Sequence, residues 1–185
     1  SPLKPIQLLW LNLVTDGAPA LALGTEKGDP DIMEQPPRPK NEPIINRFMM
    51  VGIGIQTVAI AAATLLAYAS GLRMGNQQIA ETMAFVTLSL SELLRAYTAR
   101  SERYPLLKMG VFKNKWMNLA VLSSFALIMA VIYLPFLNGV FDTVPLTLVE
   151  WAEIIPLMLL PSVAAELVKY IVSGKKKPDA EESLL

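Results

Sequence analysis

The hydrophobic residues of the chain form five long blocks separated by polar segments, rather than stripes on amphipathic helices. The blocks cover residues 5–23, 48–70, 83–99, 117–137 and 151–172. Each approaches the roughly 20 residues with which an α-helix crosses about 30 Å of hydrocarbon. The pattern therefore predicts an all-α integral membrane bundle of five transmembrane helices. We expect one transmembrane domain over residues 1–172 and a polar cytoplasmic tail over residues 173–185.

The composition favours a membrane protein and excludes several kinds of site. Hydrophobic residues make up 53% of the chain and charged residues 17%, whereas soluble domains carry about 25% charged residues. The chain contains no cysteine and no histidine, so it has no disulfide and lacks the usual ligands of zinc. The long apolar blocks make the lipid bilayer the expected partner. Because the formal net charge is zero, we expect no nucleic acid.

Basic residues are concentrated in segments that would lie on one side of the membrane. They are frequent in loops 24–46 and 100–116 and just after residue 172, whereas the other side has Lys4 and Arg73. The positive-inside rule places both loops and the C-terminus in the cytoplasm. The N-terminus of the chain is then outside without a sorting signal, so we expect the C-terminal piece of a larger protein. In a bacterium, that protein would lie in the cell membrane.

Three polar residues interrupt the first apolar block. Asn12, Thr15 and Asp16 stand at positions i, i+3 and i+4, which share one face of an α-helix. They offer an amide carbonyl, a hydroxyl and a carboxylate, and Ca²⁺ binds six to eight oxygens of such kinds. Gly17 and Pro19 follow, so we expect the first helix to be unwound near Asp16–Pro19, which would free backbone carbonyls. Alternatively, Asp16 forms a hydrogen bond to a neighbouring helix and Pro19 only bends the span.

A second candidate carboxylate lies inside the third block. Glu92 occurs in "SLSELLRAY", one turn after Ser89, and ionisable residues within a membrane usually mark ion or substrate paths. It is therefore a candidate metal ligand. The alternative is an intrahelical ion pair with Arg95 at i+3. We expect Glu153 and Glu166 of the last block to be interfacial or paired instead.

Small and hydroxyl residues inside the spans are expected to serve helix packing. Ser123 and Ser124 of the fourth block are expected to form contacts between helices. Gly52 and Gly54 of the second block suit the close approach of a neighbouring helix.

The run "PIQLLWLNLVTDGAPALALG", with "DIMEQPPRP" after it, closely resembles the C-terminal transmembrane region of P-type cation-transporting ATPases. The resemblance covers nearly the whole chain and is greatest to calcium pumps of the sarcoplasmic-reticulum type and their bacterial relatives. It implies that the five spans are the sixth to tenth helices of such a pump. The family's sixth-helix ion ligands fall on Asn12, Thr15 and Asp16, and its eighth-helix carboxylate falls on Glu92. Sodium/potassium pumps resemble the chain less, because they tend to have an acidic residue where Asn12 stands.

The resemblance also implies partners outside the chain. Loop 24–46 resembles the cytoplasmic loop that contacts the phosphorylation domain, with Asp29, Asp31 and Glu34 at its acidic positions. Gln35 stands in place of the basic residue that often precedes "PPR". The family's phosphorylated motif "DKTGT" does not occur in the chain. The Mg²⁺ and ATP of such a pump would therefore bind to domains in its N-terminal remainder, and the chain alone should be inactive.

These observations favour the transmembrane part of an ATP-driven, P-type calcium-exporting pump, a translocase whose transported ion is Ca²⁺. One alternative is a P-type pump for another cation, such as Mn²⁺ or Na⁺. A second is a membrane anchor or assembly module that transports nothing, in which the polar residues only hold helices together. A third is a carrier driven by an ion gradient, although the sequence contains no visible inverted repeat of the kind found in such carriers.

Overall fold

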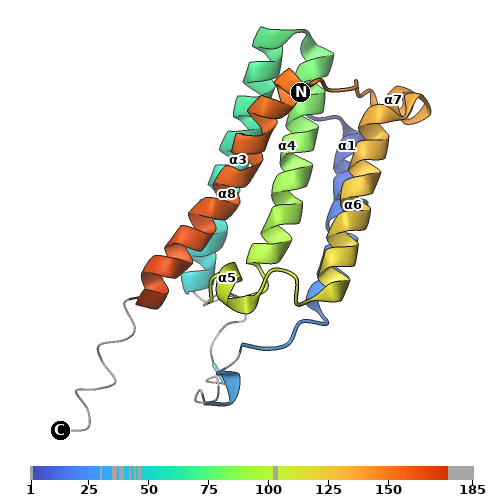
Figure 1. Cartoon of the computed structure of the whole chain (residues 1–185). Coiled ribbons are helices and arrows are strands. Elements are labelled where there is room, and N and C mark those ends of the chain that lie inside the picture. Colours follow the sequence, from blue (N-terminus) through green and yellow to red (C-terminus); the bar gives the residue numbers. More distant parts are fainter. Residues whose placement is uncertain are drawn as a thin grey trace, which may run out of the picture.

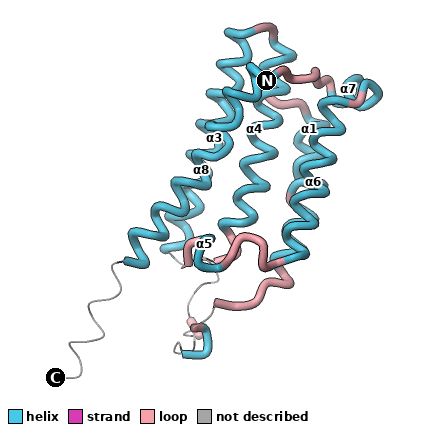
Figure 2. Tube along the Cα trace, in the orientation of Figure 1, coloured by secondary structure: helices cyan, strands magenta, loops and turns pink. Residues whose placement is uncertain are grey.

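The polypeptide folds into long helices that lie side by side (Figure 1). The computed structural model describes residues 2–29, 31–34, 37, 40, 41, 43, 45, 47–101 and 104–174. Within this part of the chain the regular elements are helices, and the remainder is turn and loop (Figure 2). The predicted all-α fold is confirmed.

The long helices follow one another in the order of the predicted spans. In chain order the elements are α1 (Pro5–Trp10), the π-helical segment η1 (Leu11–Thr15), α2 (Gly17–Leu23), the 3₁₀ turn η2 (Ile32–Glu34), α3 (Arg47–Met74), α4 (Gln77–Thr98), α5 (Leu106–Met109), α6 (Lys115–Tyr133), α7 (Pro135–Phe141) and α8 (Leu148–Gly174). The predicted spans overlap α1–η1–α2, α3, α4, α6 and α8, while their borders within a membrane stay predictions.

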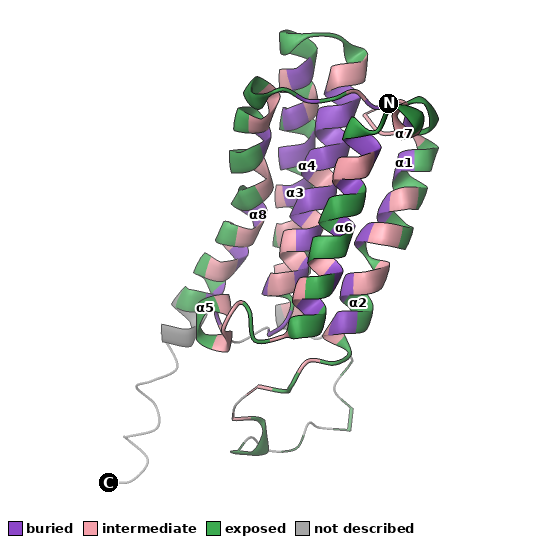
Figure 3. Cartoon of the chain, turned by 45° about the vertical axis from the view of Figure 1, so that its right-hand side comes forward, coloured by how far each residue is buried: buried purple, intermediate pink, exposed green. Residues whose placement is uncertain are grey.

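Helix α4 lies inside the bundle and differs in composition from its neighbours. Four described segments are long and apolar enough to cross a membrane: Pro5–Leu23, Met49–Met74, Lys115–Tyr133 and Leu148–Tyr170. Helix α4 is not among them, but it packs against α3, α6 and α8 and is buried along most of its length (Figure 3). A helix surrounded by protein does not need the apolar surface that lipid requires. Its polar residues are therefore compatible with a place in the middle of the bundle.

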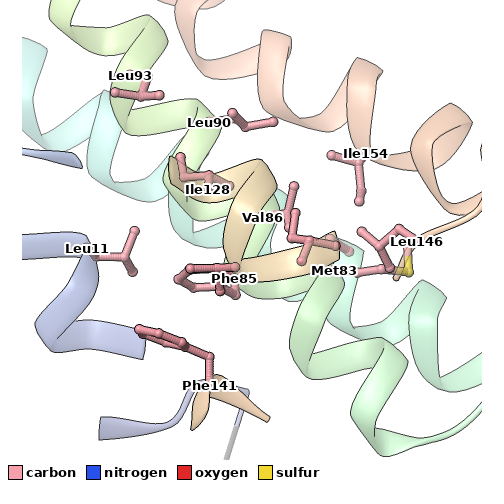
Figure 4. Close-up of a cluster of buried hydrophobic side chains, with 13 residues drawn as sticks. Leu11, Met83, Phe85, Val86, Leu90, Leu93, Ile128, Phe141, Leu146 and Ile154 are labelled. Atoms are coloured by element: carbon pink, nitrogen blue, oxygen red, sulfur yellow. The ribbon is translucent and has the colours of Figure 1, made fainter. Parts of the chain in front are cut away.

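The hydrophobic core joins α4 to the helices around it. Phe85 of α4 is fully buried, and the same cluster includes Ile128 of α6 and Ile154 of α8 (Figure 4). Phe141 of α7 belongs to this cluster and meets Trp10 of α1 edge to face, with ring centroids 4.9 Å apart. The core thereby fixes the first span beside α4 and α6.

Helix α4 comes very close to α3 at Gly71. A Cβ atom on Gly71 would lie 2.5 Å from the Cα of Ala80, so a larger residue would push the two helices apart. A Cβ on Gly52 or Gly54 would meet no described atom within 4 Å. The expected helix approach at Gly52 and Gly54 is therefore wrong for the described chain, because sequence spacing alone does not reveal where two helices meet.

The first span changes from α-helical to π-helical hydrogen bonding at η1. The amide of Asp16 donates to the carbonyl of Leu11, five residues earlier and 3.2 Å away. In a continuous α-helix the Pro19 ring would clash with the carbonyl of Thr15, and the wider turn before it is consistent with relief of that clash. Helix α2 begins at Gly17, so Pro19 lies in a first turn whose amides have no helical partner. The break expected over Asp16–Pro19 thus lies one turn earlier, and Gly17 and Pro19 are helical.

Candidate cation site

The candidate ligands of the first span lie on η1 and directly after it. Asn12 and Asp16 are exposed in the described chain, whereas Thr15 is 1% exposed. The Thr15 hydroxyl has no hydrogen-bond partner among the described residues. Regular α-helical spacing predicts one common face for the three side chains, but the π turn changes that spacing. The structure therefore directs Thr15 into the bundle while Asn12 and Asp16 remain accessible.

Glu92 of α4 forms the intrahelical pair that the sequence left as an alternative. One of its carboxylate oxygens lies 3.3 Å from Nη1 of Arg95, and 26% of its side chain is exposed. The pair borders a cavity of about 400 Å³, to which Thr57 and Thr64 of α3 also contribute. Glu92 is thus paired and yet accessible from this cavity.

The carboxylates of Asp16 and Glu92 lie in the same region of the bundle. Asp16 interacts electrostatically with both Arg95 and Glu92, because η1 packs against α4. Arg95 is therefore a cation that both carboxylates share. Among the described residues there is no group of three or more Asp, Glu, His or Cys side chains that could hold a metal ion. The described chain offers part of a coordination shell: two carboxylates and nearby neutral oxygens.

A hydroxyl group of α6 holds the backbone of η1. Ser124 is 1% exposed, and its Oγ donates to the carbonyl of Val14 at 2.8 Å. A π turn disturbs the α-helical pairing of backbone carbonyls, and Ser124 satisfies one of them. The expected contact of Ser124 with another helix is confirmed, whereas Ser123 bonds to Ala120 of its own helix. The link between Ser124 and the site could not be predicted, because nothing in the sequence pairs this serine with η1.

At the end of the bundle that carries α5, Arg100 connects three segments. Its Nε and Nη2 donate to the carboxylate of Glu26 at 2.8 and 2.9 Å, and its Nη1 donates to the carbonyls of Gly110 and Val111. Asn114 also donates to Glu26, at 2.7 Å. The hydrogen bond from Arg100 is the largest of the effects that hold the pKa of Glu26 below its usual value. We call these five residues the Arg100 clasp.

The two other carboxylates of the last span have partners, as expected. Glu166 lies 3.0 Å from Nζ of Lys169 in the same helix, and Glu153 accepts a hydrogen bond from Ser70 of α3 at 2.8 Å. Neither carboxylate lies with Asp16 and Glu92, so neither is a candidate ligand.

Known proteins resemble this chain along most of its length. The family model described as "Cation transporting ATPase, C-terminus" matches residues 1–171. The chain is 32% identical over 186 residues to a "Calcium-transporting ATPase 1" of Bacillus cereus, an alignment that covers 91% of the chain and 21% of that relative. It is 37% identical over 163 residues to a "Calcium-transporting ATPase" of Bacillus subtilis, covering 87% of the chain and 18% of the relative. A "Probable calcium-transporting ATPase" of Trypanosoma brucei brucei is 37% identical over 169 residues, covering 78% of the chain and 17% of the relative. The chain therefore spans about a fifth of the length of the curated relatives it matches.

Proposed function

Because the chain belongs to the cation-transporting ATPases, as their C-terminal region, we propose that it is the transmembrane part of an ATP-driven, P-type calcium-exporting pump. The relatives that match it are named calcium-transporting ATPases. The observation that carries the proposal is that Asn12 and Asp16 are exposed beside a helix break within an apolar span. An unpaired carboxylate is costly in lipid, so this position calls for a cation or for neighbouring polar groups of a larger pump.

In this proposal the ligands come from two spans. Asp16 and Glu92 supply negative charge, and Asn12 and Thr15 supply neutral oxygens, a mixture that suits Ca²⁺. The hydroxyl of Thr15 supports the assignment, because it is buried without a described partner and such a group is otherwise unfavourable. The remaining oxygens of the shell would come from helices in the N-terminal remainder of the pump.

Arg95 has a part in the same proposal. Its guanidinium pairs with Glu92 and interacts with Asp16, so it balances the carboxylates when no ion is bound. A metal ion and a guanidinium repel each other strongly where the dielectric constant is low. Binding of Ca²⁺ therefore requires Arg95 to turn away from Glu92.

ATP hydrolysis would take place outside this chain, which alone would be inactive. Mg²⁺ and ATP would bind in the N-terminal remainder, and loop 24–46 would contact its phosphorylation domain. Asp29, Asp31 and Glu34 of that loop lie at or beside η2, whereas Gln35 falls outside the described residues. Transport then requires two global states of the pump that differ in their affinity for the ion.

Substitution of Asp16 tests the ligand assignment. Asp16→Asn keeps the size of the side chain and removes its charge, so we expect the apparent Ca²⁺ affinity of the full-length pump to fall on the order of a hundredfold or more. Phosphorylation of the pump by ATP at increasing Ca²⁺ concentrations measures this affinity. Glu92→Gln should have a smaller effect, because the charge of Glu92 is already partly neutralised by its direct ion pair with Arg95. Glu153→Gln removes a carboxylate from α8 and should leave the affinity unchanged.

The alternatives give different results in the same assay. Normal expression and unchanged Ca²⁺ dependence of Asp16→Asn would favour a membrane anchor or assembly module. Activation of the wild-type pump by Mn²⁺ or Na⁺ but not by Ca²⁺ would identify a pump for another cation.

A further inference from the structure

A basic cavity lies at the end of the bundle where α2 ends and α6 begins. Its volume is about 670 Å³, and its walls come from the chain after α2, from Arg100 and from the segment that leads into α6. Four lysines line it, namely Lys27, Lys108, Lys113 and Lys115. We call this feature the basic cavity.

The positive charge of the basic cavity is not balanced by its described surroundings. Glu26 is the acidic residue that lines it, and its carboxylate already pairs with Arg100 and accepts a hydrogen bond from Asn114. All four lysines are exposed, and none of them forms an ion pair with another residue that the structure describes. A hollow lined by one sign of charge focuses the field and attracts ions of the opposite sign. The basic cavity is therefore suited to an anion.

The wall next to α6 is held in a defined shape. Gly110 has a φ of +82°, which favours glycine, and a Cβ there would lie 3.0 Å from side-chain carbons of Lys113. The stem of Lys113 thus packs over Gly110. Arg100 also holds the turn at Gly110 in place, because its guanidinium donates to the carbonyls of Gly110 and Val111.

An exposed apolar stripe begins at the edge of the basic cavity. Trp116, Leu119 and Leu122 of α6 are 64%, 58% and 65% exposed and follow one another at intervals of three residues on an apolar span. Trp116 also lines the cavity. Tryptophan is enriched where hydrocarbon meets the headgroup region of a membrane. The basic cavity therefore opens at the depth of the lipid headgroups.

We propose that the basic cavity binds the phosphate-bearing headgroup of an anionic phospholipid from the leaflet at this end of the bundle. The acyl chains follow the stripe of Trp116, Leu119 and Leu122. A lipid fits better than a soluble anion, because the charged hollow and the apolar stripe are continuous through Trp116. The lipid site goes beyond cation transport and does not depend on which ion the pump carries.

Lipid titration of the full-length protein tests this site. Phosphatidylglycerol serves as the probe and phosphatidylcholine as the neutral reference, and native mass spectrometry counts the lipids bound to the protein. Each lysine near a membrane surface strengthens the binding of anionic lipid about fivefold. The triple variant Lys27→Gln, Lys108→Gln and Lys113→Gln should therefore bind phosphatidylglycerol roughly a hundredfold more weakly, with phosphatidylcholine unaffected.

A matched variant separates a defined site from general attraction to charge. Lys175→Gln, Lys176→Gln and Lys177→Gln remove the same charge from the segment after α8 and should leave the tightly bound phosphatidylglycerol in place. Equal losses in the two triple variants would overturn the proposal. So would displacement of the lipid by inorganic phosphate at millimolar concentration, which would identify a site for a soluble anion.

A milder set of variants covers the case in which the first triple variant does not fold, as judged by thermal unfolding. Lys108→Gln and Lys113→Gln alone should each weaken phosphatidylglycerol binding about fivefold. Trp116→Ala leaves every lysine in place and should weaken the binding of both lipids, because it removes an acyl-chain contact. Unchanged phosphatidylglycerol binding in all three single variants would contradict the site.

Discussion

Arg100 is a charged side chain with 1% of its surface exposed, and its surroundings explain how that is tolerated. Removing an ion from water costs several kcal/mol unless a counter-charge and hydrogen bonds replace the solvent. Glu26 supplies the charge, and the carbonyls of Gly110 and Val111 accept further hydrogen bonds. Because these contacts hold the pKa of Glu26 below its usual value, the pair stabilises the fold above the unfolded pKa of about 4.3. That stability is lost as the pH falls through the lowered pKa of the folded state.

Glu26→Gln should therefore change both the stability of the protein and its pH dependence. At neutral pH the variant leaves a buried guanidinium without its counter-charge, which costs about 3 kcal/mol, so the midpoint of thermal unfolding should fall. Below about pH 4.3 the wild-type midpoint should decline toward that of the variant, since the carboxylate of the unfolded state is protonated first and that of the folded state only at its lowered pKa. Glu34→Gln, at an exposed residue, is the matched control. Parallel pH profiles of wild type and Glu26→Gln would contradict this role.

At the scale of elements, the first span depends on a helix that is distant in sequence. Ser124 of α6 donates to the carbonyl of Val14 in η1, and this contact is partly buried, with Ser124 itself 1% exposed. A carbonyl that loses its donor costs about 1–3 kcal/mol when it is fully buried and less when water can reach it. The π-helical segment is therefore held in place by α6 as well as by its own hydrogen bonds, and the position of Asp16 depends on both.

Ser124→Ala should loosen η1 without removing any proposed ligand. We expect faster amide hydrogen exchange over residues 11–16 and a weaker apparent Ca²⁺ affinity, because the ligands lose their fixed positions. Ser124→Thr keeps a hydroxyl, so its amide exchange and its apparent Ca²⁺ affinity should be closer to those of the wild type than in Ser124→Ala. Ser123→Ala is the neighbouring control, since Ser123 bonds within its own helix. Identical exchange in Ser124→Ala and Ser123→Ala would show that the contact with Val14 does not hold η1.

The sequence predicts the helices of this chain better than their contacts. The apolar blocks and the polar residues in them correspond to long helices, and even α4 is predicted despite its polarity. The break in the first span is displaced by one turn, because Gly17 and Pro19 start a helix after a π turn instead of forming a gap. The pair of Glu26 and Arg100 lies 74 residues apart in sequence, and no local pattern reveals it. The ion-ligand roles of Asp16 and Glu92 stay predictions, since the described chain holds only part of a shell.

The whole molecule has two ends with different loops, and the distribution of lysine and arginine predicts which side of a membrane each end faces. Met33 in η2 is 93% exposed, and Leu148 at the start of α8 is 87% exposed. If the positive-inside rule holds, Met33 lies in the cytoplasm and Leu148 lies outside. The absence of cysteine from the chain makes both positions convenient for labelling.

Cysteines at these two positions should react differently in intact cells. In a full-length pump without other cysteines, Leu148→Cys should react with a membrane-impermeant maleimide, and Met33→Cys should react only after the membrane is permeabilised. The labelling of both variants after permeabilisation is the control for access. The reverse pattern in intact cells would mean that the chain is inverted in the membrane.

The Arg100 clasp has a consequence for how the bundle can move. Glu26 follows α2 and Arg100 follows α4, so the clasp ties together the same ends of the two spans that carry Asp16 and Glu92. When two helices are fixed to each other at one end, they separate most easily at the opposite end. Any change in the distance between the two carboxylates should therefore arise from tilting about this tether, and the path that opens should face the end of the bundle where Leu148 lies.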